Sequence, residues 1–204
     1  MRGKFITLEG IDGAGKSTHL RSIARFLKCH GLKVKVTREP GGTAMGEKLR
    51  RLVLGSKGGL NPETETLLMF AARREHLEKV IVPALAAGWW VLCDRFTDAT
   101  YAYQAAGSGV NWKKITILER WTQEGLQPDL TILFDVSPAI GRRRAGRRKN
   151  LDRFEQEKGA YYRRVRNAYL RRARENPRRV RVIDSSRSLA EVDKQLEKLL
   201  LSFC

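Results

Sequence analysis

The feature that most constrains the fold of this chain is the segment at residues 10–17, Gly-Ile-Asp-Gly-Ala-Gly-Lys-Ser, which matches the pattern G-x-x-x-x-G-K-[ST]. Residues 4–9 before it read as a strand, and residues 17–28 after it read as a helix. Three glycines let successive backbone N–H groups turn toward one anion, and the helix adds the partial positive charge of its N-terminus. We therefore expect this loop to bind the phosphates of a nucleoside triphosphate.

Two side chains of the loop have specific expected roles. Lys16 is placed to bridge the β- and γ-phosphates, and the Ser17 hydroxyl is placed to ligate Mg²⁺. GTPases, helicase-type ATPases and small-molecule kinases share such a loop, so it does not choose an activity, although the sequence has no Asn-Lys-x-Asp guanine signature. The residues expected to bind the triphosphate are Gly10, Ile11, Asp12, Gly13, Ala14, Gly15, Lys16, Ser17 and Thr18.

Short β-rich runs alternate with helical patterns along the chain, which predicts an α/β fold with a parallel sheet. The predicted strands are residues 4–9, 33–37, 89–94, 130–135 and 180–184. Asn61-Pro62 and Ser137-Pro138 are typical helix starts, and Ser188 with Glu191 has capping-box spacing. The last helix then shows one apolar stripe, formed by Leu189, Val192, Leu196, Leu199 and Phe203. With no repeat and no linker in the sequence, we expect residues 1–204 to form a single domain.

The net charge of +18 is concentrated in one region, because residues 141–181 contain 17 Lys and Arg against 4 Asp and Glu. A nucleic-acid surface is one interpretation, which the interspersed Tyr161, Tyr162 and Tyr169 favour. A phosphate-handling segment followed by a solvated basic helix is the other, and we expect nucleic acid not to be the main partner.

Nothing in the sequence suggests export. It has no apolar run near the roughly 18–20 residues that span a membrane and no signal-peptide pattern at its N-terminus. Cys29, Cys93 and Cys204 lie far apart, without metal-ligand or disulfide spacing. We expect a cytoplasmic protein.

Four further motifs follow the loop in the order found in bacterial thymidylate kinases, and the chain resembles that family from its first strand to about residue 185. They are Thr-Arg-Glu-Pro-Gly-Gly-Thr at 37–43, Asp-Arg-Phe-Thr-Asp-Ala-Thr-Tyr-Ala-Tyr-Gln at 94–104, Pro-Asp-Leu-Thr-Ile-Leu-Phe-Asp-Val at 128–136 and Leu-Asp-Arg-Phe-Glu-Gln-Glu at 151–157. The resemblance implies a three-layer P-loop kinase fold, with a central parallel sheet of about five strands between helices and a small lid. It also implies Mg²⁺-dependent, in-line transfer of the γ-phosphate of ATP to dTMP, and a homodimer. A P-loop kinase for another nucleotide or nucleoside is the alternative.

The resemblance implies that Arg95 and Arg38 hold the acceptor phosphate, which suits the guanidinium fork. Asp94 is then expected near Mg²⁺ and the transferring group, as a metal ligand with Ser17. Asp12 is similar to a carboxylate that meets the deoxyribose 3′-hydroxyl. Glu39 is expected among the substrate-binding residues, with the orientation of an arginine as its alternative role. Three of these residues have a plainer interpretation: a surface Arg95 paired with Asp94, a loop cation at Arg38, and an Asp12 that stabilises its own loop.

For the base, the resemblance implies an aromatic ring stacked on thymine and an arginine that reads a carbonyl. Phe70 and Arg74 have the spacing of one helix face, whereas anchoring on His76 selects Arg73 with Met69 at the stacking position. We expect Phe70 and Arg73, with Arg74 as the alternative for the arginine and a core position as the alternative for Phe70. Other acceptor contacts expected from the resemblance are Arg50, Thr100, Tyr103 and Gln104.

The arginine-rich segment at about residues 141–153 is the expected lid. Cations there lower the barrier to phosphoryl transfer by meeting the negative charge of the equatorial oxygens, and the phosphate loop itself contains no arginine. Arg148 and Arg153 match the lid pattern of the family best, and Arg144 is expected at the ATP. The expected catalytic residues are Lys16, Arg95, Asp94, Arg148, Arg153 and Asp12.

Overall fold

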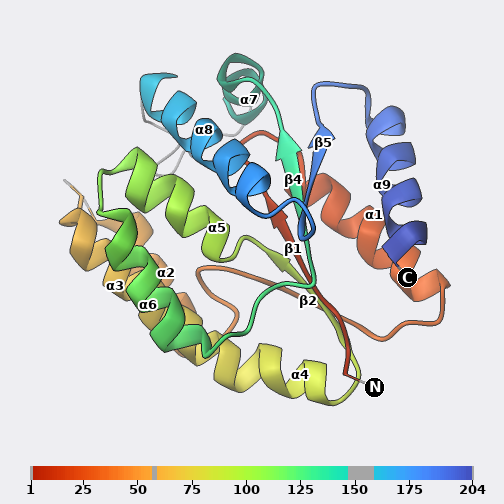
Figure 1. Cartoon of the computed structure of the whole chain (residues 1–204), viewed down its shortest axis with the longest axis horizontal. Helices are drawn as coiled ribbons and strands as arrows, with labels where there is room; N and C mark the ends of the chain where they lie inside the picture. Colours follow the sequence, from red (N-terminus) through yellow and green to blue (C-terminus); the bar gives the residue numbers. More distant parts are fainter. Residues whose placement is uncertain (1, 57–58, 147–158, 204) are drawn as a thin grey trace.

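The computed structural model describes residues 2–56, 59–146 and 159–203 and contains a five-stranded parallel sheet in the order β2-β3-β1-β4-β5 (Figure 1). The predicted parallel sheet is confirmed, and each strand begins and ends within one residue of its predicted bounds. The strands are β1 (Phe5–Glu9), β2 (Val34–Arg38), β3 (Trp90–Asp94), β4 (Leu130–Asp135) and β5 (Val180–Asp184).

Helices connect the strands and cover both faces of the sheet (Figure 1). The predicted starts at Asn61 and Ser137 are confirmed, because each side chain accepts from a backbone N–H of the first helical turn. The helical elements are α1 (Lys16–Cys29), α2 (Ala44–Gly55), α3 (Pro62–His76), η1 (Leu77–Ile81), α4 (Val82–Ala86), α5 (Thr97–Thr100), η2 (Tyr101–Gly107), α6 (Trp112–Gln123), α7 (Pro138–Ala145), α8 (Gly159–Glu175) and α9 (Leu189–Phe203).

Alternating side chains of the central strand divide the core into two sides. Phe5 belongs to a buried cluster with Leu77 of η1 and Leu85 of α4, whereas Ile6 and Leu8 belong to a cluster with α1. Figure 1 shows α1 and α9 together on one side of the sheet, with α4 and α8 on the other. The chain thus forms the helix–sheet–helix layers that the sequence predicts.

The last helix begins as predicted but buries a slightly different stripe. The capping box is present, since Ser188 N donates to Glu191 Oε2 at 3.0 Å. Val192, Leu196 and Leu200 are buried, whereas Leu189 is 62% exposed. The prediction that Leu189 joins the apolar stripe is wrong, because the first helical turn extends beyond the core and leaves this side chain in solvent.

The carboxyl ends of all five strands lie at one edge of the sheet, because the strands are parallel. β1 runs into the glycine-rich loop, and β3 ends at Asp94. Ligands of open parallel sheets bind beyond such ends, where crossovers leave in opposite directions. Among the described residues, no helix is long and apolar enough to span a bilayer.

Candidate active site

A cavity of about 430 Å³ opens beyond the carboxyl ends of β1, β2 and β3. Its walls come from the glycine-rich loop, the loop after β2, and α2, α3, α5 and η2. Most residues predicted for the site line this one cavity: Asp12, Gly13, Gly15, Lys16, Ser17, Thr18, Glu39, Arg50, Asp94, Arg95, Thr100, Tyr103 and Gln104. Donor-loop and acceptor-motif residues that are far apart in the sequence therefore share one space.

The glycine-rich loop has a backbone that requires glycine. Gly10 and Gly13 have φ values of +138° and +76°. A Cβ on Gly13 would lie 2.1 Å from Gly141 O, and one on Gly10 would lie 2.5 Å from Phe134 O. The loop is thus held against α7 and β4. Two predicted members, Ile11 and Ala14, have buried side chains, so they can offer a ligand only their backbone.

Lys16 is buried at the floor of the cavity. Its Nζ donates to Gly10 O at 2.8 Å and to Ile11 O at 3.0 Å. Burial, together with the charge of Arg95, lowers the pKa of Lys16 to about 8. A polyphosphate in this loop would favour the charged ammonium.

Arg95 follows β3, lines the cavity and contacts the glycine-rich loop directly. Its Nη2 donates to Asp12 Oδ1 at 2.5 Å and to the Tyr103 hydroxyl at 3.0 Å. Its Nη1 donates to Gly10 O at 3.3 Å and to the Tyr169 hydroxyl at 3.2 Å. Burial opposes ionisation of Asp12, but the positive charges of Arg95 and Lys16 outweigh it and lower its pKa. The plainer interpretation of Arg95, a surface arginine paired with Asp94, is therefore wrong.

Asp94 and Ser17 offer oxygen atoms to the same cavity. Asp94 Oδ1 is buried and has no hydrogen-bond partner within the described part of the chain, while the Ser17 side chain is exposed. Mg²⁺ in phosphate-transfer sites takes few protein oxygens and completes its coordination with phosphate and water. The pair fits that chemistry, whereas residues 2–56, 59–146 and 159–203 contain no cluster of three or more His, Cys, Asp or Glu that could hold a metal alone.

A buried polar chain runs behind the wall formed by Glu39 and Thr100. Arg73 Nε donates to Glu39 Oε2 at 2.7 Å, and its Nη2 donates to Thr100 Oγ1 at 3.0 Å. His76 Nδ1 lies 3.0 Å from Glu39 Oε1, and its Nε2 lies 2.7 Å from Thr37 Oγ1. Burial opposes ionisation of Glu39, but Arg73 and His76 outweigh it and lower its pKa. Arg73 Nη1 is buried without a hydrogen-bond partner in the described chain.

The structure separates the two arginines that the sequence left open. Arg73 is 3% exposed and belongs to the buried polar network with Glu39. Arg74, in contrast, is 44% exposed and pairs with Glu78 and Glu124 on the surface. The expectation of Phe70 at the cavity is wrong, because its ring is buried in a cluster with Tyr101 of η2. Met69 lines the cavity instead, so the structure favours the register that pairs it with Arg73.

The remaining predicted acceptor residues lie at the cavity. Thr100 and Gln104 are buried, and Gln104 Nε2 donates to Glu65 Oε1 at 2.9 Å. The amide of Gln104 is therefore held at the cavity wall and is not solvated. Arg50 of α2 donates to Pro40 O at 3.0 Å, which ties α2 to the loop after β2.

Two predicted arginines point elsewhere. The side chain of Arg38 is 55% exposed, pairs with Glu47 at 2.9 Å and does not line the cavity. Arg38 is the last residue of β2, the edge strand, so its side chain is free to turn toward solvent and α2. Arg144 Nη1 donates to Ser185 O at 2.8 Å behind the loop and also does not line the cavity. Of the expected lid, residues 141–145 belong to α7, and Arg148 and Arg153 lie outside the described residues.

A profile of the thymidylate kinase family matches residues 8–196 of the sequence. The chain belongs to the thymidylate kinase family. It is 57% identical to the thymidylate kinase of Nitrosomonas europaea over 202 residues, which cover 99% of this chain and 94% of that protein. It is 58% identical to the one of Nitrosospira multiformis, covering 97% of each. The crystal structure of thymidylate kinase from Ehrlichia chaffeensis superposes with a TM-score of 0.80 at 34% identity, over 98% of this chain and 99% of that one. The expected family and fold are confirmed.

Some residues of the site carry no motif signal in the sequence. Glu9, Tyr162 and Tyr169 are buried, and each bonds with Asp12, Arg95 or one another. Glu9 did carry a weaker signal: it is a carboxylate at the end of the largely apolar β1, and a buried charge needs polar partners. Tyr162 and Tyr169 are seven residues apart on α8 and share one face. Since they face the site, they do not support a nucleic-acid surface.

Proposed function

We propose that this cavity transfers the γ-phosphate of ATP to dTMP and gives ADP and dTDP, the ATP-dependent reaction of the thymidylate kinase family. The observation that carries the proposal is the shared cavity, which Lys16 and other residues of the glycine-rich loop line together with Arg95. The γ-phosphate of ATP and the phosphate of dTMP can meet in line in this cavity. A phosphate oxygen of dTMP attacks the γ-phosphorus while the bond to the bridging oxygen of ADP breaks.

Positioning and charge supply the catalysis, without a covalent intermediate. Lys16 is placed at the donor phosphates, and Arg95 is placed to hold the acceptor phosphate. Tyr103 and Asp12 hold the guanidinium of Arg95, which reduces the reorganisation needed when phosphate binds. Arg50 lines the same cavity and adds positive charge on the acceptor side.

Ser17 and Asp94 would hold Mg²⁺. Asp94 Oδ1 supports this role, because it is buried, no donor among the described residues meets it, and such a carboxylate oxygen suits a cation. When bound, the ion neutralises charge on the transferring phosphates. Asp94 itself lies on β3 beside the turn that carries Arg95, so its position couples the donor side to the acceptor side.

Arg73 is the group that we propose for recognition of the base. Its Nη1 has no hydrogen-bond partner among the residues that the structure describes, while Glu39 and Thr100 fix the rest of the guanidinium. A carbonyl of thymine would satisfy that donor. Met69 then supplies an apolar surface for the ring, and Gln104 supplies an amide at its polar edge.

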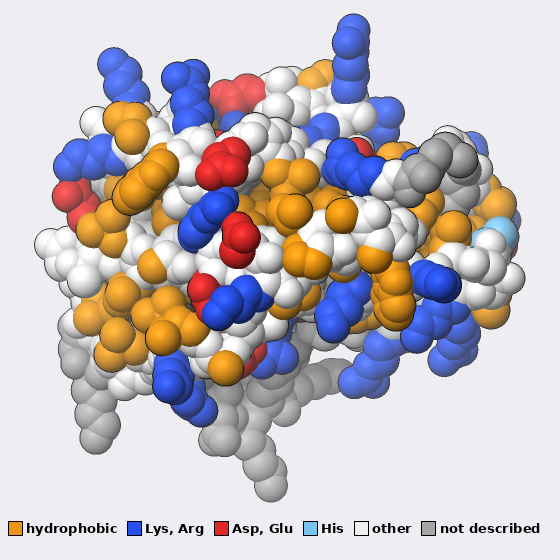
Figure 2. Space-filling view, turned by 90° about the horizontal axis from the view of Figure 1, so that it is seen from below, with side chains coloured by type: hydrophobic (Ala, Val, Ile, Leu, Met, Phe, Trp, Pro, Cys, Tyr) orange, Lys and Arg blue, Asp and Glu red, His pale blue; other side chains and the backbone are white. Residues whose placement is uncertain are grey.

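We also propose that two copies of the chain associate through α3 and α6. Leu67 of α3 is exposed, and so are Ile117 and Trp121 of α6, with Trp121 at 74%. Ile117 and Trp121 are four residues apart and share one helix face. Figure 2 views the molecule from below, where α4 lies lowest in Figure 1, and shows hydrophobic side chains in patches among basic ones. Burying the exposed side chains of Leu67, Ile117 and Trp121 would favour association.

Sedimentation equilibrium tests this association. Trp121→Glu should shift a dimer to monomers, whereas Leu201→Glu on α9, also exposed in the monomer, should not. A monomeric wild-type protein at micromolar concentration would contradict the proposal.

Two further expectations from the sequence, a single domain and a cytoplasmic location, stay predictions.

A coupled assay of ADP release tests the reaction itself. With Mg·ATP, dTMP should support turnover well above dUMP, dCMP, dGMP and AMP. Lys16→Ala and Arg95→Ala should each lower kcat/KM by about 10²–10³-fold, the usual cost of removing one group that stabilises transition-state charge. No turnover with dTMP above the other nucleotides would overturn the assignment, and retained kcat/KM in either variant would overturn the role of that residue.

A further inference from the structure

Arg95 has a backbone conformation that few arginines adopt. Its φ of +70° lies in the left-handed region, where a residue with a Cβ is strained unless surrounding contacts hold it. Its own N–H donates to Leu8 O at 2.9 Å, and the N–H of Phe96 donates to Glu9 Oε1 at 2.7 Å. The last two residues of β1 therefore hold the turn that carries Arg95.

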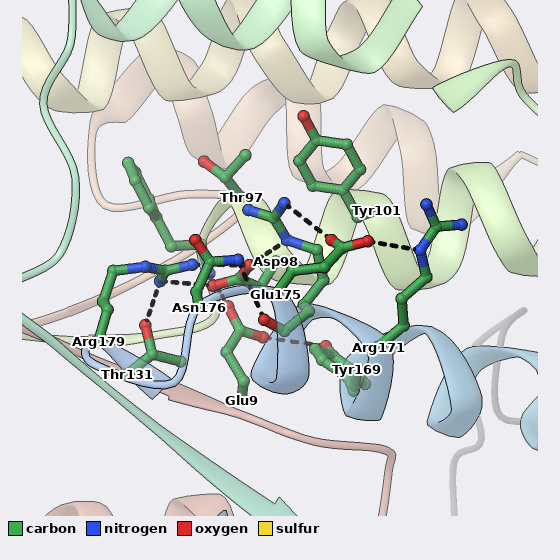
Figure 3. A network of polar contacts seen from close by, with 12 residues as sticks. Glu9, Thr97, Asp98, Tyr101, Thr131, Tyr169, Arg171, Glu175, Asn176 and Arg179 are labelled. Atoms are coloured by element: carbon green, nitrogen blue, oxygen red, sulfur yellow. Dashed lines mark hydrogen bonds and ion pairs between the residues drawn. The ribbon is translucent and has the colours of Figure 1, made fainter. Parts of the chain in front are cut away.

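The second carboxylate oxygen of Glu9 reaches the side chain of Arg95 through α8. Glu9 Oε2 accepts from the Tyr169 hydroxyl at 2.9 Å, and that hydroxyl lies 3.2 Å from Arg95 Nη1. A guanidinium only donates, and a tyrosine hydroxyl has one proton. Tyr169 can therefore accept from Arg95 only while it gives its proton to another acceptor. Glu9 is that acceptor, and Figure 3 shows the two side chains joined.

A second contact from α8 holds the same turn. Arg172, one helical turn after Tyr169, donates from Nε to Asp98 Oδ1 at 2.8 Å. Arg179, which follows α8, donates from Nη1 to Asp98 Oδ2 at 2.7 Å and to Thr131 Oγ1 at 2.6 Å (Figure 3). The turn is thus held at its start by Glu9 and Tyr169 and at its end by this ion cluster.

We propose that Glu9 and Tyr169 are positioning residues for Arg95. Glu9 fixes the bend of the backbone through Phe96 N–H, and it orients the Tyr169 hydroxyl so that this hydroxyl accepts from the guanidinium. Neither residue lines the cavity, so both act on the reaction through Arg95. The inference rests on the role proposed above for Arg95, which is to hold the phosphate of dTMP.

Steady-state kinetics of two conservative variants test the proposal at pH 9, which is above the pKa of about 8 of Glu9, so that its carboxylate is ionised and accepts from Tyr169. Tyr169→Phe removes only the hydroxyl. Glu9→Gln keeps an acceptor for Phe96 N–H but presents an amide N–H to Tyr169, which turns the hydroxyl proton toward Arg95. Each change should raise the KM for dTMP and lower kcat, for a loss of about tenfold or more in kcat/KM, because a hydrogen bond to a charged group is lost. The KM for ATP should stay within about twofold, since Lys16 and the loop amides are unchanged.

The matched control is Tyr101→Phe. It removes a hydroxyl that bonds Thr116 and Glu119 on α6, away from Arg95. This variant should keep all kinetic constants within about twofold, as expected for hydroxyls outside the site. It therefore controls for the removal of a buried tyrosine hydroxyl as such, away from Glu9 and Arg95.

A double-mutant cycle separates positioning from a merely structural role. In an Arg95→Lys background, Tyr169→Phe should cost little more, because the contact it serves is already lost. Equal losses in the wild-type and Arg95→Lys backgrounds would overturn the proposal, and so would a lower Tm with unchanged kinetics. If Arg95→Ala lowers kcat/KM but Tyr169→Phe and Glu9→Gln do not, this proposal alone is overturned. If Arg95→Ala leaves kcat/KM unchanged, the proposed role of Arg95 is overturned as well.

Discussion

Arg95 and Asp12 form an ion pair with 2.5 Å between Nη2 and Oδ1, although 83 residues separate them in the sequence. Asp12 belongs to the donor loop and Arg95 to the acceptor side, so the pair joins the two halves of the site. The Tyr103 and Tyr162 hydroxyls donate to the other oxygen of Asp12, at 3.0 and 3.2 Å. Contacts within the protein therefore hold the two halves together, which is the kind of preorganisation that electrostatic catalysis uses.

The close approach of the glycine-rich loop to α7 predicts different effects for two glycines with the same φ of +76°. Gly13→Ala should raise the KM for ATP by about tenfold or more, because its Cβ would meet Gly141 O at 2.1 Å and displace the loop. At Gly31 an added Cβ would meet no atom of the described residues within 4 Å, so Gly31→Ala should lose about 1 kcal/mol of stability and keep its activity. ATP titrations and urea unfolding of both variants measure this. Equal kinetic effects would show that steric contact is not the cause.

The lowered pKa of Lys16 predicts that ATP binding takes up a proton in mildly alkaline solution. At pH 8 about half of the Lys16 side chains are neutral in the nucleotide-free protein, and the triphosphate favours the charged form. Calorimetry in buffers of different ionisation enthalpy should show an uptake approaching half a proton at pH 8. Lys16→Arg, whose guanidinium stays charged, should abolish that uptake. The same uptake in both proteins would contradict the assignment.

The buried pair of Arg73 and Glu39 predicts unequal costs for two adjacent arginines. Arg73→Ala should lower the free energy of unfolding by about 3–5 kcal/mol, because it leaves Glu39 buried without its cation. Arg74→Ala should cost less than about 1 kcal/mol, since its ion pairs are on the surface. Urea denaturation measures both. A similar loss in the two variants would show that burial does not separate them.

The raised pKa of Glu9 predicts a pH dependence of stability. Burial and the nearby Asp98 raise it from 4.5 to about 8, so the folded protein binds this proton more tightly than the unfolded chain does. The free energy of unfolding should therefore fall as pH rises from about 4.5 to about 8.

Glu9→Gln removes this titration. Relative to wild type, the variant should gain roughly 2–4 kcal/mol in the free energy of unfolding between pH 5 and pH 8, measured by urea denaturation across that range. A stability difference that does not change with pH would mean that Glu9 titrates near its ordinary value when folded.

Local patterns predicted the sheet and the donor loop because the physics there is local. A glycine-rich turn between a strand and a helix has few alternatives, and Gly10 and Gly13 require it through their own backbone angles. The same holds for Asn61 and Ser137, whose side chains cap helices within the next few residues.

The acceptor side depended on partners distant in sequence. The sequence alone could not choose between Arg73 and Arg74, because neighbouring positions on a helix face different ways and only Glu39, 34 residues earlier, shows which one is buried. Arg38 is at a strand end, but nothing local shows that Glu47 draws it outward. Glu9 and Tyr169 are 160 residues apart, so no local pattern joins them.

The most direct test of the account is a crystal structure with dTMP and a non-hydrolysable ATP analogue, read at the distance from the dTMP phosphate to the Arg95 guanidinium. We predict hydrogen-bond contact, about 2.7–3.0 Å, with the γ-phosphate of the analogue on the loop amides beside Lys16. A dTMP phosphate bound away from Arg95, or the two nucleotides in separate cavities, would contradict the account.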